Sequence, residues 1–287
     1  MTEPTDRSPF VVSFDWLAQS LGQADLKIVD ASWYLPAQNR NGSAEFAVSR
    51  IPGAVFFDQD SIVAAGSDLP HTIPDPDAFA RAAGDLGLSS TDTIVVYDGP
   101  GMFTAPRVWW LLRIFGAANT YVLDGGFDAW KAQGLPLETG DHARPSPADF
   151  NASLTSGAIT DFSSMRSIVE HRSSQIADAR GPGRFAGVEP EPREGMRSGH
   201  MPGARNVPFS NLSEGGTLKP LSELRRVLEG SGLDLDKPVV TTCGSGVTAA
   251  VITLALHSIG HRDNTLYDGS WSEWGGRDDT PIATGDV

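Results

Sequence analysis

The sequence predicts an α/β protein of two tandem domains, each a mostly parallel sheet with helices on both faces. Strand-like and helix-like segments alternate along both halves of the chain, and four short motifs of the first half recur in the second half in the same order. Alternation of this kind is typical of parallel sheets covered by helices. The recurrence indicates that one domain plan is used twice.

The first half shows the alternation most clearly. Apolar segments bounded by turn residues predict buried strands at 26–32, 93–99 and 120–126. Residues 77–87 have the spacing of a helix that stops at a glycine, and residues 105–116 predict a helix that is apolar over most of its surface. Together these segments describe one α/β domain.

The repeat divides the chain. We expect a first domain at 1–140, a linker at 141–157 and a second domain at 158–287, because the intervening segment is rich in Pro, Ala, Ser and polar residues and reads as unable to bury much apolar surface. The paired motifs are KIVDASW (27–33) with QIADARG (175–181), RIPGAVFFD (50–58) with HMPGARNVPF (200–209), TIVVYDG (93–99) with PVVTTCG (238–244), and YVLDGGFDAW (121–130) with NTLYDGSWSEW (264–274).

Composition excludes several classes of function. The chain has 22 Lys and Arg against 36 Asp and Glu, a net charge of −14, so nucleic acid is a poor partner. No apolar segment reaches the roughly 18–20 residues that span a membrane, and the polar N-terminus does not resemble a secretory signal. One cysteine forms no internal disulfide, and the scattered histidines predict no metal site. We expect a cytoplasmic protein without a cofactor.

The single cysteine, Cys243, lies between a predicted strand at 239–242 and a predicted helix at 247–260. Ligands of parallel sheets bind at the carboxyl ends of the strands. A Gly-Ser-Gly turn that opens into a helix directs backbone N–H groups into one hollow, where they stabilise a thiolate. The alternative is a small buried hydrophobic residue. The turn favours a reactive nucleophile.

Several long motifs carry a resemblance that covers nearly the whole chain. They are CGSGVTA (243–249), IPGAVFFD (51–58), TAPRVWW (104–110), GRFAGVEPEPREGMRSGHMPGA (183–204) and LYDGSWSEWG (266–275). In this order they resemble the rhodanese-like sulfurtransferases, and within them the 3-mercaptopyruvate sulfurtransferases. The resemblance implies two tandem rhodanese-like domains with the active site between them.

Two positions refine this resemblance. Relatives that use thiosulfate typically carry Arg-Lys after the cysteine, whereas Gly244 and Ser245 stand here, which favours the mercaptopyruvate branch. The repeat places Asp98 where the second domain has Cys243. A carboxylate forms no persulfide, so the first domain is expected to be inactive.

The resemblance implies that Arg184 and Arg193 bind the substrate, and arginine suits a carboxylate because its planar fork donates two hydrogen bonds. The alternative is that both are loop arginines paired with Glu189, Glu191 or Glu194. The residues alone favour the second interpretation, whereas the resemblance favours substrate binding.

The resemblance also implies a relay in which Asp60 and His71 of the first domain reach Ser245 behind Cys243, with the logic of a Ser-His-Asp triad. The alternatives are a surface histidine and an aspartate that caps a helix. Asp58 lies two residues from Asp60 and is easily confused with it.

Backbone amides of the cysteine loop are expected to hold the transferred sulfur, namely those of Gly244, Gly246, Val247 and Thr248. Thr248 also stands where it can cap the following helix. The tryptophans near the equivalent ends of the two repeats are interpreted as packing residues.

The predicted reaction is a ping-pong cycle. Cys243 takes sulfur from 3-mercaptopyruvate, releases pyruvate, and passes the sulfur to cyanide, a thiol or a thioredoxin-like protein. A thiosulfate sulfurtransferase and a non-catalytic rhodanese-like binding module are the alternatives. A cysteine phosphatase is excluded because Ala249 stands where its phosphate loop needs arginine. The hydrolase motif G-x-S-x-G is absent around Ser245, and the Gly-x-Gly of 99–101 lacks the third glycine of a dinucleotide site.

Overall fold

The computed structural model describes residues 6–142 and 145–285. The ends of the two expected domains, 1–5 and 286–287, lie outside the described residues, as do residues 143–144 of the expected linker. Within the described ranges, no helix is long and apolar enough to cross a membrane.

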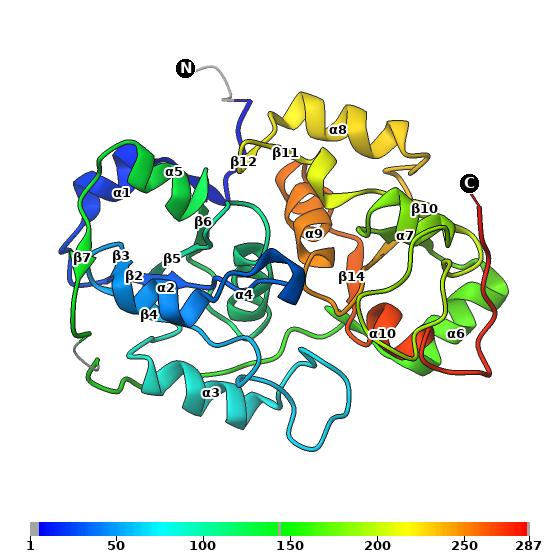
Figure 1. Cartoon of the computed structure of the whole chain (residues 1–287), viewed down its shortest axis with the longest axis horizontal. Coiled ribbons are helices and arrows are strands. Elements are labelled where there is room, and N and C mark those ends of the chain that lie inside the picture. The colour runs from blue at the N-terminus through cyan, green and yellow to red at the C-terminus, as the bar shows by residue number, and fades with distance from the viewer. Residues whose placement is uncertain (1–5, 143–144, 286–287) are drawn as a thin grey trace.

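The predicted fold class is confirmed, with two five-stranded parallel sheets (Figure 1). In the first domain the strand order is β1-β6-β5-β2-β4. Its strands are β1 (Val11–Val12), β2 (Leu26–Asp30), β4 (Ala54–Phe56), β5 (Thr93–Tyr97) and β6 (Thr120–Leu123). Its helices are α1 (Phe14–Ser20), α2 (Gly42–Val48), α3 (Pro76–Asp85), α4 (Ala105–Ile114) and α5 (Gly126–Ala132).

The second domain repeats this plan with the order β10-β9-β13-β14-β8, all parallel. Its strands are β8 (Ile159–Thr160), β9 (Gln175–Asp178), β10 (Ala204–Asn206), β13 (Val239–Thr242) and β14 (Asn264–Tyr267). Its helices are α6 (Phe162–His171), α7 (Pro182–Ala186), α8 (Leu221–Gly230), α9 (Ala249–Ser258) and α10 (Ser270–Trp274). Two short antiparallel pairs, β3 (Ser49–Arg50) with β7 (Glu138–Thr139) and β11 (Ser213–Glu214) with β12 (Thr217–Leu218), complete the strands.

Both faces of each sheet are buried, as the continuous apolar strands predict. Along β5, Ile94 and Val96 join a central hydrophobic cluster, whereas Val95 and Tyr97 join an outer cluster. Helices α3 and α4 contribute to the central cluster, and α1, α2 and α5 to the outer one. In the second domain, α8 and α9 share the central cluster, while α6, α7 and α10 pack on the opposite face of the sheet.

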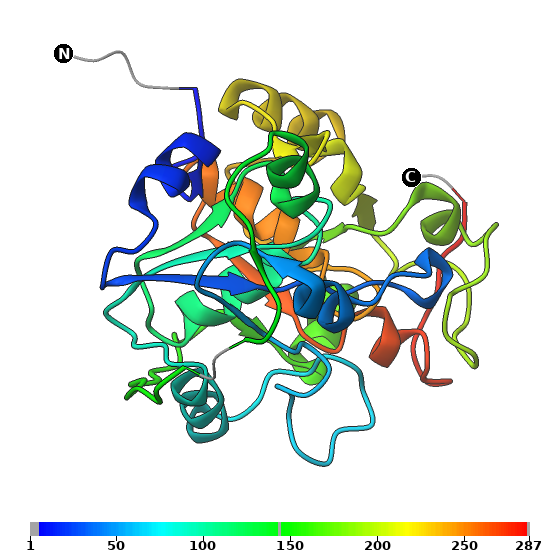
Figure 2. The same ribbon diagram turned by 60° about the vertical axis from the view of Figure 1, so that its left-hand side comes forward.

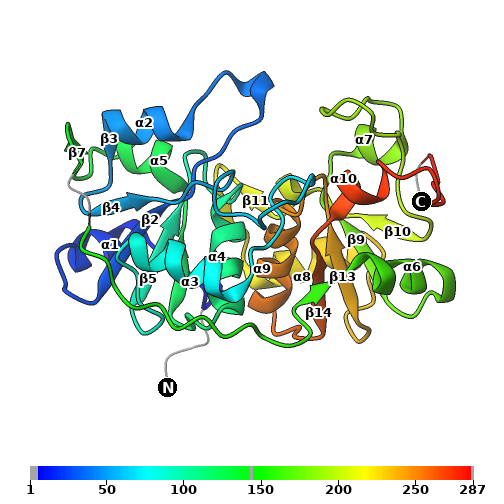
Figure 3. The same cartoon turned by 90° about the horizontal axis from the view of Figure 1, so that it is seen from below.

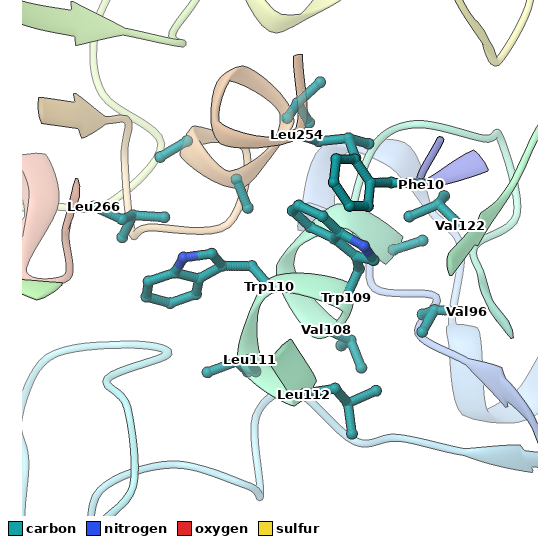
Figure 4. Packing of buried hydrophobic residues seen from close by; sticks show 14 of the residues in the cluster. Phe10, Val96, Val108, Trp109, Trp110, Leu111, Leu112, Val122, Leu254 and Leu266 are labelled. Atoms are coloured by element: carbon teal, nitrogen blue, oxygen red, sulfur yellow. The ribbon is translucent and has the colours of Figure 1, made fainter. Parts of the chain in front are cut away.

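The central cluster runs through both domains, because α4 and α9 lie side by side between the sheets (Figures 1 and 3). Trp109 and Trp110 of α4 are buried there near Leu254 of α9 and Leu266 of β14, which agrees with the expected packing role of the tryptophans (Figure 4). Each of these helices follows the middle strand of its sheet. Their contact therefore brings the loops at the ends of these strands to the domain interface.

The segment after β7 contacts the first domain closely. Phe150 is buried and packs edge-on against Phe79 of α3 at 5.5 Å between ring centroids. The amide of Ala148 donates to the carbonyl of Gly84 at 2.9 Å, and a Cβ on Gly84 would lie 2.5 Å from the carbonyl oxygen of Ala148. The expectation that this polar segment buries little apolar surface is therefore wrong at Phe150, whose ring completes the core beside α3.

Candidate active site

Cys243 directly follows β13 and is buried, with 2% of its surface exposed. Its carbonyl accepts a hydrogen bond from the amide of Trp271 at 2.9 Å. The next carbonyl, of Gly244, accepts from the amide and the hydroxyl of Ser272 at 2.8 and 2.7 Å. These bonds fix the start of the cysteine loop against α10.

Asp98 occupies the equivalent place after β5 in the first domain. Its carbonyl accepts from the amide of Phe127 at 2.8 Å, as that of Cys243 does from Trp271. Burial raises the pKa of the Asp98 carboxyl, and hydrogen bonds from four backbone amides oppose that rise. The carboxylate oxygens accept from the amides of Gly101 (2.6 Å), Phe103 (3.0 Å), Thr104 (2.7 Å) and Ala105 (2.6 Å).

The two loops share a left-handed glycine, although the first loop is one residue longer before its helix and also holds Met102 at φ +50°. Gly101 has φ +82° and Gly246 has φ +79°, and each glycine stands three positions after Asp98 or Cys243. In the first loop the amides point at the side chain of the residue that directly follows the strand. This convergence of N–H groups is the feature expected of an anion cradle.

A chain of hydrogen bonds crosses the domain interface to the cysteine loop. Asp60 and His71 lie on the long loop between β4 and α3, which extends from the first domain (Figure 2). Nδ1 of His71 is 2.9 Å from Oγ of Ser245, and Nε2 is 3.0 Å from Oδ1 of Asp60. The structure therefore brings the three expected relay residues together, with the imidazole buried and the carboxylate largely exposed.

Protonation states follow from these contacts. Burial lowers the pKa of His71, and the Asp60 carboxylate opposes this shift, so the ring is neutral at neutral pH. The hydrogen bond with His71 in turn lowers the pKa of Asp60. Because a carboxylate only accepts, Nε2 carries the ring proton, and Nδ1 is left to accept from the Ser245 hydroxyl.

Asp58 and Asp60 have different surroundings. The Asp58 carboxylate accepts from the amide of Asp60 at 3.0 Å and from the hydroxyl of Ser61 at 2.6 Å, which closes a local turn. Asp60 faces His71 and also accepts from Nε1 of Trp33 at 2.9 Å. Asp60 is thus neither the turn-closing carboxylate nor a helix cap.

Trp33 is a site residue that the sequence analysis missed. Its ring lies edge-on to His71, at 4.8 Å between centroids and 87° between planes, while its N–H holds Asp60. The available signal was its position, since it ends the repeated motif KIVDASW just beyond a strand. Trp33 thus contacts both the His71 ring and the Asp60 carboxylate of the expected relay.

The two arginines that are expected to bind substrate differ in their ion pairs. Arg184, in α7, forms an ion pair with the buried Glu191, which also pairs with Arg180 at 2.7 Å. A Cβ on Gly244 would lie 3.0 Å from Nη2 of Arg184, so the guanidinium lies against the cysteine loop. The expected pairing with Glu191 is therefore present, and Arg184 also lies beside the cysteine loop, so its expected binding of substrate stays a prediction. The sequence analysis had named Glu191 only as one of three possible ion-pair partners.

Arg193 forms no ion pair with a carboxylate of residues 6–142 or 145–285. Its Nη1 lies 3.5 Å from Oγ of Ser272. Burial lowers the pKa of Arg193. The charges of Cys243 and Asp60 oppose this shift, whereas the charge of Arg184 reinforces it. Arg193 is therefore a half-buried cation beside the thiol, available for an anionic ligand.

The predicted helix at 247–260 begins two residues later, at Ala249. Thr248 stands at the N-cap position, but its side chain accepts no hydrogen bond from the helix, so the expected capping role is wrong. Its φ of −75° and ψ of −14° are already helical, whereas a capping side chain normally needs an extended residue.

Gly246 is required by both its backbone and its neighbours. A Cβ there would lie 3.1 Å from the carbonyl oxygen of Asp268 and 3.2 Å from Nη1 of Arg107. Gly246→Ala is expected to lower the free energy of unfolding by about 2–3 kcal/mol and to lower activity. Gly260→Ala is the control, since Gly260 has φ +89° with nothing within 4 Å, and about 1–2 kcal/mol is expected there. If urea titrations gave equal losses of unfolding free energy for the two variants, close contacts around Gly246 would not explain the effect.

Comparison with known proteins places the chain in a family. The model of the rhodanese-like domain matches residues 13–133 and 162–277. The human 3-mercaptopyruvate sulfurtransferase is 43% identical over 272 residues, covering 92% of this chain and 91% of the relative. The chain belongs to the 3-mercaptopyruvate sulfurtransferase family. This family assignment agrees with the resemblance carried by the cysteine loop and the long motifs.

Further relatives of this 3-mercaptopyruvate sulfurtransferase family agree in fold and length. The Arabidopsis thaliana thiosulfate/3-mercaptopyruvate sulfurtransferase 1, mitochondrial, is 40% identical over 302 residues, covering 98% of this chain and 80% of the relative. The crystal structure of the Escherichia coli 3-mercaptopyruvate sulfotransferase SseA matches with a TM-score of 0.84 and 40% identity, covering 92% of this chain and 99% of that one.

Proposed function

We propose that this enzyme transfers sulfur from 3-mercaptopyruvate to a thiol or cyanide acceptor through a persulfide on Cys243. The observation that carries the proposal is the hydrogen-bonded chain Ser245–His71–Asp60, which starts two residues from the only thiol of the sequence. A non-catalytic binding module would have no use for a buried neutral histidine held between a serine and a carboxylate.

Arg193 and Arg184 are proposed to bind the carboxylate and keto oxygen of the donor. Arg193 has no carboxylate partner among the described residues and lies within electrostatic reach of Cys243. Arg184 borders the loop at Gly244. A guanidinium that donates two parallel hydrogen bonds orients a planar carboxylate, so the pair would direct the sulfur of the donor toward the thiolate.

The first half-reaction moves the donor sulfur onto the enzyme. The Cys243 thiolate attacks the sulfhydryl sulfur, a sulfur–sulfur bond forms, and the carbon–sulfur bond breaks with its electron pair going to carbon as the enolate of pyruvate. The sulfhydryl proton passes through the Ser245 hydroxyl to Nδ1 of His71 and returns to the enolate carbon. Cys243 is left as a persulfide anion and pyruvate leaves, so atoms and charge balance.

Backbone amides are proposed to stabilise the persulfide anion. In the first domain, four amides of the matching turn converge on the Asp98 carboxylate. Because Gly246 has a left-handed φ at the same distance from Cys243 as Gly101 has from Asp98, the amides of Gly246, Val247 and Thr248 are the candidates for this role, with that of Gly244 beside them. The terminal sulfur would occupy the place that the Asp98 carboxylate fills in the first domain.

The second half-reaction needs an external nucleophile. No second cysteine exists in the sequence to resolve the persulfide. A small thiol, cyanide or a thioredoxin-like protein would attack the outer sulfur and restore the Cys243 thiolate. The proposed partners are therefore one small-molecule donor and one of these acceptors.

The rate of pyruvate release is expected to fall in acid with a midpoint below 6.5, the ordinary pKa of histidine. Protonated His71 donates from both nitrogens and takes no proton from Ser245, so activity is present above the lowered pKa and lost as the pH falls through it. His71→Ala should lower kcat by about 10²- to 10⁴-fold and remove this acid limb. Profiles of kcat against pH for both proteins test this, and a midpoint above 6.5 contradicts it.

Thiosulfate is the second candidate donor, because the Arabidopsis relative is named for both substrates. The uncharged Gly244 and Ser245 after the cysteine favour mercaptopyruvate. Measurement of kcat/KM for the two donors separates them. We expect a strong preference for 3-mercaptopyruvate, and a strong preference for thiosulfate would overturn the proposal.

We also propose that residues 1–140 and 158–287 are the two domain units, joined by 141–157, and that the first is inactive. Strand β7 pairs with β3 of the first domain, and β8 is the next strand and belongs to the second sheet. Asp98 stands where the catalytic thiol would be needed. A cytoplasmic location is proposed because the lone thiol must stay reduced to act, and cell fractionation tests this.

A further inference from the structure

Arg107, on α4 of the first domain, is buried at the domain interface with 1% of its surface exposed. Its Nη2 donates to the carbonyl of His71 at 2.6 Å and to Oδ1 of Asp268 at 2.8 Å, and its Nη1 lies 3.3 Å from the carbonyl of Gly246. The guanidinium also lies over the ring of Trp110, at 4.9 Å. One side chain thus reaches the relay histidine, the cysteine loop and the second sheet.

Asp268, directly after β14, completes a clamp with Arg107. Its Oδ1 accepts from Arg107, and its Oδ2 accepts from the amide of Ile73 at 2.8 Å. The loop that carries His71 is therefore held at two backbone points, the carbonyl of residue 71 and the amide of residue 73. Both points are fixed by this one ion pair, which joins the two domains.

The backbone of His71 needs such support. Its φ is +59°, in the left-handed region, which is uncommon for a residue with a side chain. Conformations of this kind persist when the surroundings over-determine them. The two bonds to the clamp and the ring contacts with Ser245, Asp60 and Trp33 supply that determination.

We propose that Arg107 and Asp268 are positioning residues for the relay, which hold His71 in hydrogen-bond reach of Ser245 across the domain interface. This inference rests on the proposed function, because it acts through His71. It assigns the inactive domain a task, since that domain supplies both the proton carrier and the arginine that fixes it against the catalytic loop.

Arg107→Lys is the sharpest variant, because lysine keeps the charge but lacks the planar fork that bonds several acceptors. We expect kcat for pyruvate release to fall about 10- to 100-fold, since small displacements of a catalytic group cost this much. The KM for 3-mercaptopyruvate should change less than about 3-fold, because Arg184 and Arg193 are untouched. Arg113→Lys, on the same helix, is the matched control and should retain wild-type kcat.

A double-mutant cycle with His71→Ala separates positioning from a general structural role. In the His71→Ala background, Arg107→Lys should lower kcat by less than about 3-fold further, because the group it positions is already absent. Equal factors in both backgrounds, or wild-type kcat in Arg107→Lys, would overturn the inference. Full activity of His71→Ala itself would instead overturn the proposed relay, so the two failures are distinguishable.

Asp268→Asn provides a second variant in case Arg107→Lys does not fold. The amide removes the charge and replaces one acceptor oxygen by a donor, so one of the two bonds to Arg107 and Ile73 is lost. The same cycle with His71→Ala is then measured, with thermal unfolding midpoints recorded for every variant. Non-additive losses in kcat support the clamp, and additive losses contradict it.

Discussion

Cys243→Ser is expected to lower the rate of pyruvate release from 3-mercaptopyruvate by at least about 10⁴-fold. A serine hydroxyl stays protonated at neutral pH and forms no persulfide, so the first half-reaction has no nucleophile. The change is nearly isosteric, and the strand end and α10 anchor the loop through backbone carbonyls that the variant keeps. Pyruvate released per enzyme under saturating donor measures the effect.

The control for Cys243→Ser is a measurement showing that the variant is still folded. Because Cys243 contributes to the central hydrophobic cluster, the hydroxyl is expected to cost about 1–2 kcal/mol of stability without unfolding the protein. A folded Cys243→Ser protein that still released pyruvate at the wild-type rate would show that the sulfur is extracted elsewhere.

Arg193→Gln is expected to lower kcat/KM for 3-mercaptopyruvate about 10- to 100-fold, mainly through a higher KM. Arg193 is a half-buried cation without a carboxylate partner among the described residues, so its positive charge is free for the donor. Glutamine keeps much of the length and a donor group but removes the charge. Steady-state kinetics over a range of donor concentrations give both constants.

Arg166→Gln is the matched control for Arg193→Gln. Arg166 is an exposed arginine of α6 that pairs with Asp279 at 3.1 Å on the surface, so the same loss of one charge should leave kcat/KM within about 2-fold of wild type. Equal effects of the two substitutions would mean that net charge, and not a bound carboxylate, governs donor affinity.

The sheet architecture was predictable because its signals are local. The strands β5 and β13 are short apolar segments bounded by turn residues, and the repeat places them at equivalent positions. The contact between His71 and Ser245 has no local signal, since the two residues are 174 positions apart and meet at the domain interface, where α4 packs on α9. For that reason the relay was predicted from the family resemblance, and hydrophobic periodicity gave no indication of it.

Residues whose role depends on tertiary contacts or on backbone conformation could not be predicted from the sequence. Arg107 lies in the helix predicted to be apolar over most of its surface, and no sequence motif singled it out, yet its guanidinium joins three segments of chain. Phe150 stands in a polar segment and still fills the core beside α3. Thr248 has a capping side chain, but its helical backbone leaves the cap unused.

The mass of Cys243 after reaction with 3-mercaptopyruvate tests the central claim most directly. The enzyme is treated with donor in the absence of acceptor, alkylated, digested and analysed by mass spectrometry. We predict that the peptide containing Cys243 gains one sulfur atom, and that addition of cyanide removes it. Turnover to pyruvate with no sulfur gained on Cys243 would contradict the persulfide mechanism.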